Sequence, residues 1–270
     1  MLSVIIPASN EEAYIGPCLT ALFTSTTPAE CIVVANGCHD ATAARAIALT
    51  PEANARGWAL HVLNLPQGGK PSALNAGDAA ASHTTRVYLD ADVIVSPPLM
   101  AQLAAALAPH RALYATGTPH IPAAKSPVTR AYARFWQKLP FAQSAAPGYG
   151  LFATNAMGRA RWNAFPKIIS DDTYIRLLFA PSERIQCPAP YNWPMIEGFR
   201  ALTRVRRRQD AGVAELRQLY PDLQPNEAKP GLSPSRLAGL ALTDPAGFAT
   251  YAAVTAATRL TRTSGWTRGR

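Results

Sequence analysis

Four short apolar runs, each followed by a helical pattern, limit the first 95 residues to few folds. The runs are rich in Val, Ile and Leu and lie at residues 3–7, 30–35, 59–65 and 87–95. Apolar runs of this length, bounded by turn residues, are typical of buried strands. Strands that alternate with helices predict an α/β domain: a doubly wound, mostly parallel sheet with helices on both faces.

Two aspartates interrupt the fourth run. Asp90 and Asp92 stand two residues apart, so their side chains leave an extended strand on the same side. Carboxylates at the end of a buried strand are costly unless a positive group lies close to them. A divalent ion that also holds a diphosphate meets this need, because carboxylate oxygens suit Mg²⁺ and Mn²⁺. The alternative is a strand-to-turn junction with two exposed acids.

Polar residues stand at the ends of the other predicted strands as well. Asn10, Asn36 and Lys70 lie at or after strand ends, as Asp90 does. Ligands of doubly wound sheets bind beyond the carboxyl ends of the strands, so we expect one crevice to collect all four residues. The glycines around Lys70 favour a loop that faces a ligand over a solvated lysine.

The second half of the chain is less regular. Helical patterns cover residues 99–107, 126–138, 160–165 and 174–179, and strand patterns cover 113–117, 148–154 and 185–187. Prolines between 221 and 230 mark a boundary. We therefore predict one domain over residues 1–220 and a basic, alanine-rich helical extension over 221–270.

Charge is distributed unevenly. Residues 200–270 hold 12 Lys and Arg against 5 Asp and Glu, whereas the first 199 residues hold 14 against 12. This excess predicts an anionic partner for the C-terminal region: phosphate groups, nucleic acid or a lipid surface. Few aromatic residues interleave with the arginines, which disfavours nucleic acid.

The C-terminal extension has two alternative interpretations. Residues 232–257 contain no apolar run long enough to span a bilayer. A predicted helix at 247–258, followed by Arg259, Arg262, Arg268 and Arg270, suits a segment that lies on an anionic membrane surface. The other interpretation is a helix that packs on the domain before it, with arginines that keep the end soluble.

The N-terminus and the cysteines predict a cytoplasmic protein, peripheral at the membrane if the extension binds lipid. No basic segment precedes the first apolar run, so no signal peptide is expected. The four cysteines show neither a C-x-x-C pair nor zinc spacing, which favours buried thiols in a reducing compartment.

Several segments, in this order, resemble motifs of the family 2 glycosyltransferases, inverting enzymes of the GT-A fold that use nucleotide-activated sugars. They are residues 4–12 (VIIPASNEE), 33–42 (VVANGCHDAT), 69–77 (GKPSALNAG), 90–92 (DAD), 170–172 (SDD) and 204–209 (RVRRRQ). The chain departs from the family at Asn36, where Asp is commoner. The last segment also lacks the Gln-x-x-Arg-Trp form of processive synthases.

The resemblance implies a metal-dependent, inverting hexosyltransferase that moves a sugar from a nucleoside-diphosphate sugar to an acceptor hydroxyl. Asp92 with Asp90 would hold Mn²⁺ or Mg²⁺, Asp172 would be the general base, and Asp171 would support it or bind the acceptor. Residues implied in donor binding are Pro7, Asn10, Glu11, Asn36, Asp40, Lys70, Asn75, Asp90, Arg206, Arg207 and Arg208.

The same resemblance divides the domain into a nucleotide-sugar half at about 1–95 and an acceptor half at about 96–220. The acceptor would be a sugar, a lipid-linked molecule or another small molecule. Sugars stack on aromatic rings, so the tryptophans at 136, 162 and 193 either line an acceptor site or pack in the core.

Three other functions compete with this one. A sugar-phosphate nucleotidyltransferase would carry a glycine- and arginine-rich loop after the first strand, where this chain has residues 8–12 (ASNEE). A non-catalytic nucleotide-binding or membrane-scaffold protein would not need Asp90, Asp92 and Asp172 together. The only support for a nucleic-acid-binding protein is the basic C-terminal extension.

Overall fold

The computed structural model describes residues 1–228 and 231–260, which form two compact units. The first, here called the sheet unit, comprises Met1–His120, Gly148–Lys167 and Asp171–Trp193. The second, the helical unit, comprises Ile121–Pro147, Ile168–Ser170 and the chain from Pro194 on. The predicted domain boundary at residue 220 stays a prediction.

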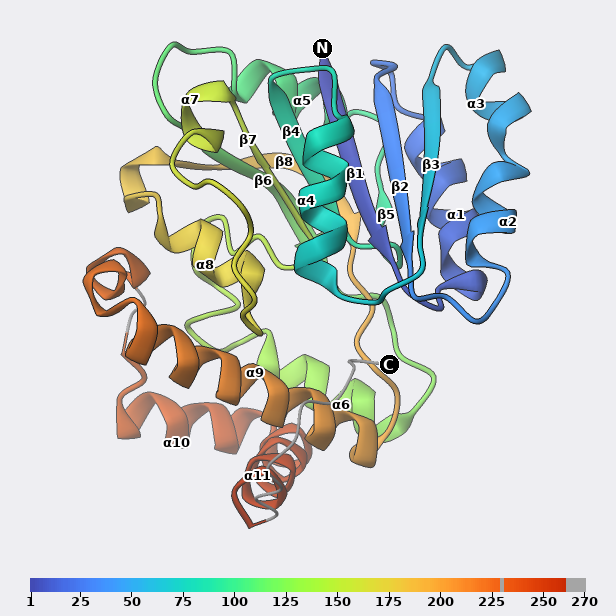
Figure 1. Ribbon diagram of the computed structural model, residues 1–270. Coiled ribbons are helices and arrows are strands. Elements are labelled where there is room, and N and C mark those ends of the chain that lie inside the picture. The colour runs from blue at the N-terminus through green and yellow to red at the C-terminus, as the bar shows by residue number, and fades with distance from the viewer. Residues whose placement is uncertain (229–230, 261–270) are drawn as a thin grey trace. The chain divides into compact units, whose positions relative to one another are not determined.

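The described part of the sheet unit contains one eight-stranded sheet in the order β3-β2-β1-β4-β7-β6-β8-β5 (Figure 1). Its first four strands are parallel: β1 (Leu2–Ala8), β2 (Glu30–Asn36), β3 (Ala59–Leu65) and β4 (Thr85–Leu89). The remaining strands are β5 (Ile94–Val95), β6 (Tyr114–His120), β7 (Leu151–Thr154) and β8 (Arg184–Asn192). The predicted α/β fold with a mostly parallel sheet is confirmed.

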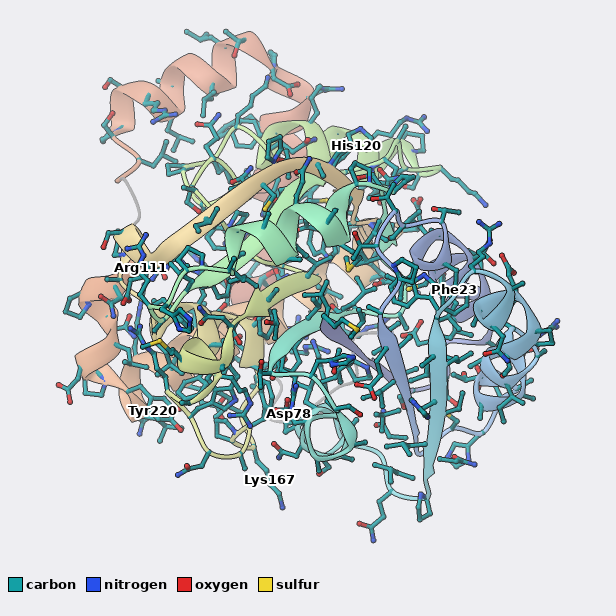
Figure 2. All side chains as sticks on the ribbon, turned by 90° about the horizontal axis from the view of Figure 1, so that it is seen from above. Phe23, Asp78, Arg111, His120, Lys167 and Tyr220 are labelled. Atoms are coloured by element: carbon teal, nitrogen blue, oxygen red, sulfur yellow. The ribbon has the colours of Figure 1, made fainter. Side chains whose placement is uncertain are left out.

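Helices cover both faces of this sheet. Successive residues of a strand point to opposite faces, so an apolar strand places side chains that need burial on both of them. Val4 and Ile6 of β1 join one buried cluster with α1 (Glu12–Phe23). The residue between them, Ile5, meets α4 (Lys70–Ala80) on the other face. A Cβ on Gly77 would lie 2.4 Å from Ile5 Cγ2, so α4 packs directly on the strand. Figure 2 labels Phe23 and Asp78 on these opposite sides.

Shorter helices complete the sheet unit. They are α2 (Thr42–Ile47), α3 (Thr50–Ala55), α5 (Leu99–Ala106), α7 (Ala156–Arg159), α8 (Asp171–Leu177) and the 3-10 helix η1 (Pro181–Glu183). The helix that we predicted at 174–179 begins three residues earlier, at Asp171.

Strand directions bring several chain ends to one edge of the sheet. β7 runs antiparallel to β4, with Leu151 opposite Leu89, so the start of β7 lies beside the end of β4. β8 runs parallel to β6, with Asn192 opposite His120. The carboxyl ends of β1, β2 and β4 lie at this same edge, which is where parallel sheets bind ligands.

The strand predicted over residues 87–95 is corrected by the structure. β4 ends at Leu89, and the N–H of Val93 donates to the carbonyl of Asp90 at 3.1 Å, which closes a turn. The chain re-enters the sheet only at Ile94. Asp90 and Asp92 therefore stand on a turn, and no extended strand aligns their side chains as we predicted.

The helix predicted at 160–165 is also wrong. The helix α7 ends at Arg159, and its N-cap is Asn155, whose Oδ1 accepts from the N–H of Gly158 at 2.9 Å. Trp162 and Phe165 are three residues apart, which imitates a helical period. Both are buried against Tyr88 in an aromatic cluster instead.

The helical unit contains α6 (Pro127–Trp136), α9 (Phe199–Leu219), the 3-10 helix η2 (Pro221–Glu227), α10 (Pro234–Thr243) and α11 (Pro245–Leu260). Its core joins Tyr132 of α6, Leu202 of α9 and Val254 of α11. Asp244 is 6% exposed and accepts two hydrogen bonds from Arg134, at 2.8 and 2.7 Å. The same carboxylate accepts from the N–H of Gly247 in the first turn of α11. These contacts hold α11 against α6.

The two helices of the C-terminal extension differ in burial. α11 packs on α6 and α9 through Val254 and Tyr251, as the second of our two interpretations expects. α10 buries none of its residues, and Leu242 is 82% exposed. None of the described helices has the length and apolar character needed to cross a membrane. Arg262, Arg268 and Arg270, which the first of our two interpretations placed near lipid, lie outside the described residues.

Candidate active site

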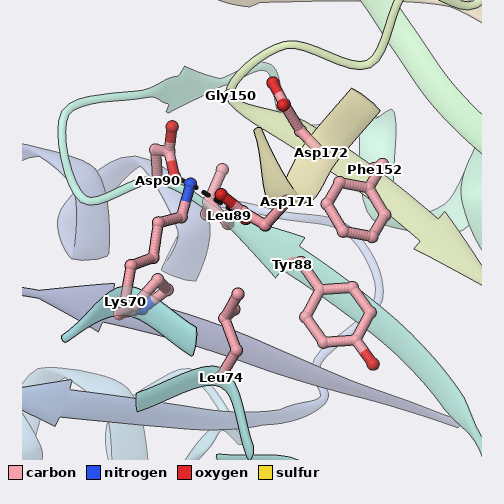
Figure 3. A pocket seen from close by; sticks show the side chains of 10 residues that line it. Lys70, Leu74, Tyr88, Leu89, Asp90, Gly150, Phe152, Asp171 and Asp172 are labelled. Atoms are coloured by element: carbon pink, nitrogen blue, oxygen red, sulfur yellow. Dashed lines mark ion pairs between the residues drawn. The ribbon is translucent and has the colours of Figure 1, made fainter. Parts of the chain in front are cut away.

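A pocket opens in the sheet unit beyond the ends of β1 and β4 (Figure 3). Strands, helix starts and the turn after β4 all contribute to it. Its lining residues are Pro7, Lys70, Leu74, Tyr88, Leu89, Asp90, Gly150, Phe152, Asp171 and Asp172. The pocket therefore gathers five of the residues that the sequence singled out, Pro7, Lys70, Asp90, Asp171 and Asp172, although more than 160 positions separate the first from the last.

Lys70 joins two carboxylates at the base of this pocket. It is the first residue of α4, and its Nζ lies 2.9 Å from Asp90 Oδ1 and 3.3 Å from Asp171 Oδ2. Burial would lower the pKa of Lys70, but the negative charges of Asp171, Asp90 and Asp172 outweigh it and raise that pKa above its ordinary value. Lys70 therefore remains a cation at physiological pH.

The two acids that open α8 have different surroundings. Asp171 is 5% exposed and turned toward Lys70, whereas Asp172 is half-buried and points away from it (Figure 3). Neighbouring helix residues are about 100° apart around the axis, which explains the divergence. Burial raises the pKa of Asp171 to about 6, although Lys70 opposes the shift. Asp172 Oδ1 accepts from the N–H of Thr173 at 2.6 Å.

The turn after β4 presents Asp90 and Asp92 with a buried alanine between them. The Asp90 side chain is 35% exposed and Asp92 is half-buried. The described residues contain no group of three His, Cys, Asp or Glu side chains arranged to hold a metal ion. Two carboxylates are hard oxygen donors, and they fit an ion such as Mg²⁺ that takes its other ligands from phosphate and water. This donor set suits a metal that arrives with a diphosphate.

Asn36 is a structural clamp in this chain. It is 2% exposed at the end of β2. Its Nδ2 donates to the carbonyls of Ala8 and Val34, at 2.9 and 3.2 Å, and its Oδ1 accepts from the N–H of Gly69 at 2.9 Å. One side chain thus links the ends of β1 and β2 to the loop that carries Lys70. A contact of Asn36 with the donor stays a prediction.

Three further predicted residues connect the loops after β1 and β2. Asn10 has a positive φ of 58°, and its Oδ1 accepts from the N–H of His39 at 2.8 Å. Asp40 Oδ2 accepts from the N–H of Glu12 at 3.1 Å. The N–H of Glu11 donates to Thr42 Oγ1 at 2.8 Å. These hydrogen bonds tie the loop after β1 to the loop after β2. Donor contacts by Asn10, Glu11 and Asp40 stay predictions.

The other residues predicted for donor binding have partners of their own. Asn75 forms two hydrogen bonds with the backbone of Phe165, at 2.7 and 3.3 Å. Arg206, in the helical unit, donates to Asp210 and to the hydroxyls of Tyr132 and Tyr251. The predicted roles of Asn75 and of Arg206, Arg207 and Arg208 at the donor stay predictions.

Gly150 has a part in the pocket that we did not predict from the sequence. It lines the pocket, and its carbonyl accepts from the N–H of Asp90 at 2.9 Å. The glycines at 148 and 150 around Tyr149 were the available signal, but we interpreted residues 148–154 only as a strand. Because β7 is antiparallel to β4, the start of β7 lies beside Asp90 and not at the opposite edge of the sheet.

Solved structures that resemble this chain include glycosyltransferases. The mannosyltransferase PcManGT from Pyrobaculum calidifontis, in complex with GDP-Man and Mn²⁺, has a TM-score of 0.59 and 20% identity over 97% of this chain and 76% of that chain. TarS 1–349 from S. aureus, in complex with UDP, has a TM-score of 0.55 and 13% identity over 96% of this chain and 91% of that chain. Glucosyl-3-phosphoglycerate synthase from Mycobacterium tuberculosis has a TM-score of 0.54 and 22% identity over 81% of this chain and 79% of that chain. The fold is therefore the GT-A fold.

The chain belongs to glycosyl transferase family 2, whose model matches residues 3–164, more than half of its length. No curated protein matches it in sequence. The predicted family and the predicted class of enzyme, a glycosyltransferase, are thereby confirmed. The matched segment contains Lys70, Asp90 and Asp92 but ends before Asp171 and Asp172.

Asn36→Asp tests the clamp. The new carboxylate would face two carbonyl oxygens to which Asn36 donates, in a place 2% exposed. We expect a loss of about 3 kcal/mol in the free energy of unfolding at pH 7, since a buried acceptor without a donor is costly. Burial raises the pKa of the new carboxyl in the folded state, so the loss should shrink below about pH 5, where the group is protonated and can donate.

Urea unfolding of this variant at pH 7 and pH 4.5 measures the effect. Asn54→Asp, at an exposed asparagine of α3, is the matched control and should change stability by less than about 0.5 kcal/mol. Equal stability of Asn36→Asp and the wild-type chain at pH 7 would contradict the clamp.

Proposed function

We propose that this glycosyltransferase moves a sugar from a nucleoside-diphosphate donor to an acceptor hydroxyl with inversion, and that Asp172 is its general base. The observation that carries the proposal is the Lys70 cation, which lies between the carboxylates of Asp90 and Asp171. Asp172 lines the same pocket. The pocket lies beyond the carboxyl ends of parallel strands, where phosphates bind in doubly wound sheets.

Lys70 would stabilise the leaving diphosphate. Negative charge develops on the phosphate as the bond to the sugar breaks, and a fixed cation in a partly buried site opposes that charge. Lys70 reaches the pocket from the N-terminal turn of α4, whose dipole also favours an anion. Asp171, buried and 3.3 Å from Nζ, would fix the direction of this side chain.

Asp92 and Asp90 would hold Mn²⁺ or Mg²⁺. Such an ion supplies a Lewis acid for the diphosphate oxygens. Support comes from the donor set of the turn and from two similar structures, since PcManGT is a complex with GDP-Man and Mn²⁺ and the M. tuberculosis synthase a complex with Mn²⁺ and UDP. The remaining predicted donor contacts are proposed at Pro7, Asn10, Glu11, Asn36, Asp40, Asn75, Arg206, Arg207 and Arg208.

Asp172 suits the role of base better than Asp171 does. A base must reach the acceptor hydroxyl from the face opposite the leaving group, and it must be unprotonated. Asp172 is half-buried and directed away from Lys70, whereas Asp171 is buried and occupied by that lysine. The proposed acceptor is a sugar, lipid-linked or other small molecule bound by residues 96–220, with the nucleotide bound by residues 1–95.

The exposed helix α10 supports a further proposal, peripheral binding to an anionic membrane surface from the cytoplasm. α10 buries none of its residues and carries Leu237, Leu240 and Leu242 together with Arg236. The region from residue 200 on has a net charge of +7 by the counts given above. An apolar helix in a basic region fits the acyl boundary and the phosphates of such a surface.

Asp92→Asn tests the metal site. Calorimetric titration with UDP and with GDP, with and without Mn²⁺, should show binding to the wild-type chain that depends on the ion. We expect the variant to lose at least about 10-fold in that affinity, because one charged ligand is removed. Asp222→Asn, at an exposed acid in the helical unit, is the control. Unchanged affinity of the Asp92 variant would remove this residue from the site.

Asp172→Asn tests the base. We expect kcat to fall by about 10²–10⁴-fold while donor binding is kept. Asp171→Asn should mainly weaken donor binding, because Lys70 loses a partner. A larger loss of kcat in the Asp171 variant would reverse the assignment. The anomeric configuration of the product is read in the same assay, and retention would contradict a single displacement.

Leu242→Glu tests the membrane contact. Wild-type protein should sediment with vesicles that contain anionic lipid at low salt and less at high salt. Leu242→Glu should lower the bound fraction more than Ala249→Glu, which makes the same charge change at an exposed position of α11. Equal sedimentation of the two variants would mean that α10 does not insert.

A further inference from the structure

We infer that Glu215, on helix α9, is a positioning residue for the acids at the start of α8. It acts through the backbone of Ile169, two residues before Asp171. The inference rests on the proposed glycosyl transfer and adds the group that sets where the proposed base, Asp172, stands. The family model matches the chain only as far as residue 164, so neither Glu215 nor the two acids fall inside the match.

The segment that leads into α8 belongs to the helical unit. The sheet unit is left at Lys167 and resumes at Asp171, and residues 168–170, here called the linking segment, are part of the helical unit. Asp171 is the first residue of α8. Consecutive Cα atoms are about 3.8 Å apart. Whatever fixes the linking segment therefore fixes where the backbone of Asp171 and Asp172 begins.

Two residues of α9 hold the linking segment. Glu215 Oε2 accepts from the N–H of Ile169 at 2.8 Å. Gly212 stands three residues earlier, and helix residues with this spacing lie on the same face. A Cβ on Gly212 would overlap Ser170 Oγ and lie 3.0 Å from Ile169 Cγ2. The segment thus packs on the bare backbone of α9, and the carboxylate of Glu215 fixes it there.

The surroundings of Glu215 make this hydrogen bond a firm one. Gly212 is buried, Leu216 is 2% exposed, and Glu215 between them is half-buried. Water therefore competes little for the carboxylate. A hydrogen bond to an ionised acceptor is also stronger than one between neutral groups. The helix around Glu215 is kept in place by the burial of Leu216 and by η2, which packs against α9.

The two acids depend on the linking segment to different degrees. Asp171 is tied through its side chain to Lys70, 3.3 Å from Nζ. Asp172 forms hydrogen bonds with its own neighbour, Thr173, at 2.6 Å to the N–H and 3.4 Å to the hydroxyl. A bond between neighbours moves with the backbone and does not fix it. The backbone before Asp172 is therefore what sets its position, whereas Lys70 also holds Asp171.

The position of Asp172 matters because a general base must reach the proton that it removes. A displacement of about 1 Å at a reacting group can lower a rate by about 100-fold. Loss of the Glu215 contact should therefore slow the chemical step and leave the ion pair of Lys70 and Asp90 in place. If Glu215 only stabilised the fold, turnover by each folded molecule would not change.

Three variants and two controls of the full chain separate these roles. Glu215→Ala removes the acceptor, and Glu215→Gln keeps an oxygen that can accept from the N–H of Ile169. Gly212→Ala pushes the linking segment away from α9. Gly239→Ala is its control, since a Cβ at this exposed position of α10 meets nothing within 4 Å. Asp222→Ala removes an exposed acid. Thermal unfolding checks that each variant is folded.

Turnover is measured with UDP-glucose, UDP-N-acetylglucosamine and GDP-mannose in the presence of Mn²⁺, with water as the acceptor. Water attacks the sugar, Asp172 takes its proton, the bond to the diphosphate breaks, and UDP or GDP is released. Hydrogen exchange of peptides from residues 168–175, read by mass spectrometry, reports on the linking segment in the same samples. Calorimetry gives the affinity for UDP or GDP.

We expect Glu215→Ala and Gly212→Ala to lower kcat by about 10-fold, with nucleotide affinity within about threefold of wild type. Glu215→Ala should also exchange faster over residues 168–175. Glu215→Gln and the two controls should keep kcat within about threefold of wild type, because the acceptor and the packing are retained.

Wild-type kcat in Glu215→Ala, or an equal loss in Glu215→Ala and Glu215→Gln, would overturn the inference. Unchanged hydrogen exchange in Glu215→Ala would overturn it as well, whatever the turnover. A folded wild-type chain that releases nucleotide from none of the three donors would instead contradict the proposed transfer. The exchange measurement alone would then decide whether Glu215 holds the linking segment.

Discussion

The ion pairs of Lys70 determine the character of the site. Asp90 and Asp171 come from different elements, and their carboxylates approach one cation, to 2.9 and 3.3 Å. Without that cation two partly buried negative charges would repel each other and lose their hydration. Lys70 therefore makes an acidic pocket compatible with a folded chain. The same positive charge is available to a diphosphate, so one side chain serves both the apo protein and the proposed complex.

The position of Lys70 depends on interactions at some distance from it. Gly77 seats α4 on β1, and Asn36 ties the loop before α4 to the ends of β1 and β2. A side chain with two amide hydrogens and one carbonyl fits this place, because two carbonyls and one N–H face it. An amide, rather than a carboxylate, thus suits the hydrogen bonds inside the protein at Asn36, whatever the residue contributes to a ligand.

Sequence patterns predicted the parallel half of the sheet because its strands are local: each run is apolar, buried and ended by a turn signal. They also predicted that Asn36, Lys70 and Asp90 follow strand ends. The turn at Asp90 was only our alternative, because Val93 continues the apolar pattern through the turn and Ile94 and Val95 belong to the next strand, β5. The position of the antiparallel strand β7 in the sheet could not be predicted, for another reason. Nothing local to residues 151–154 specifies β4 as its neighbour, so Gly150 could not be placed beside Asp90 in advance.

The path of the chain has a consequence for the order in which the site forms. The sheet unit is left at residue 120 and re-entered at 148 and again at 171. During synthesis the pair of Lys70 and Asp90 can form once β1 to β4 have emerged, but Asp171 arrives some 80 residues later. Contacts of such large sequence separation are made late and slowly. In a nascent chain the residues proposed to bind the diphosphate thus come together before the acids proposed to act on an acceptor.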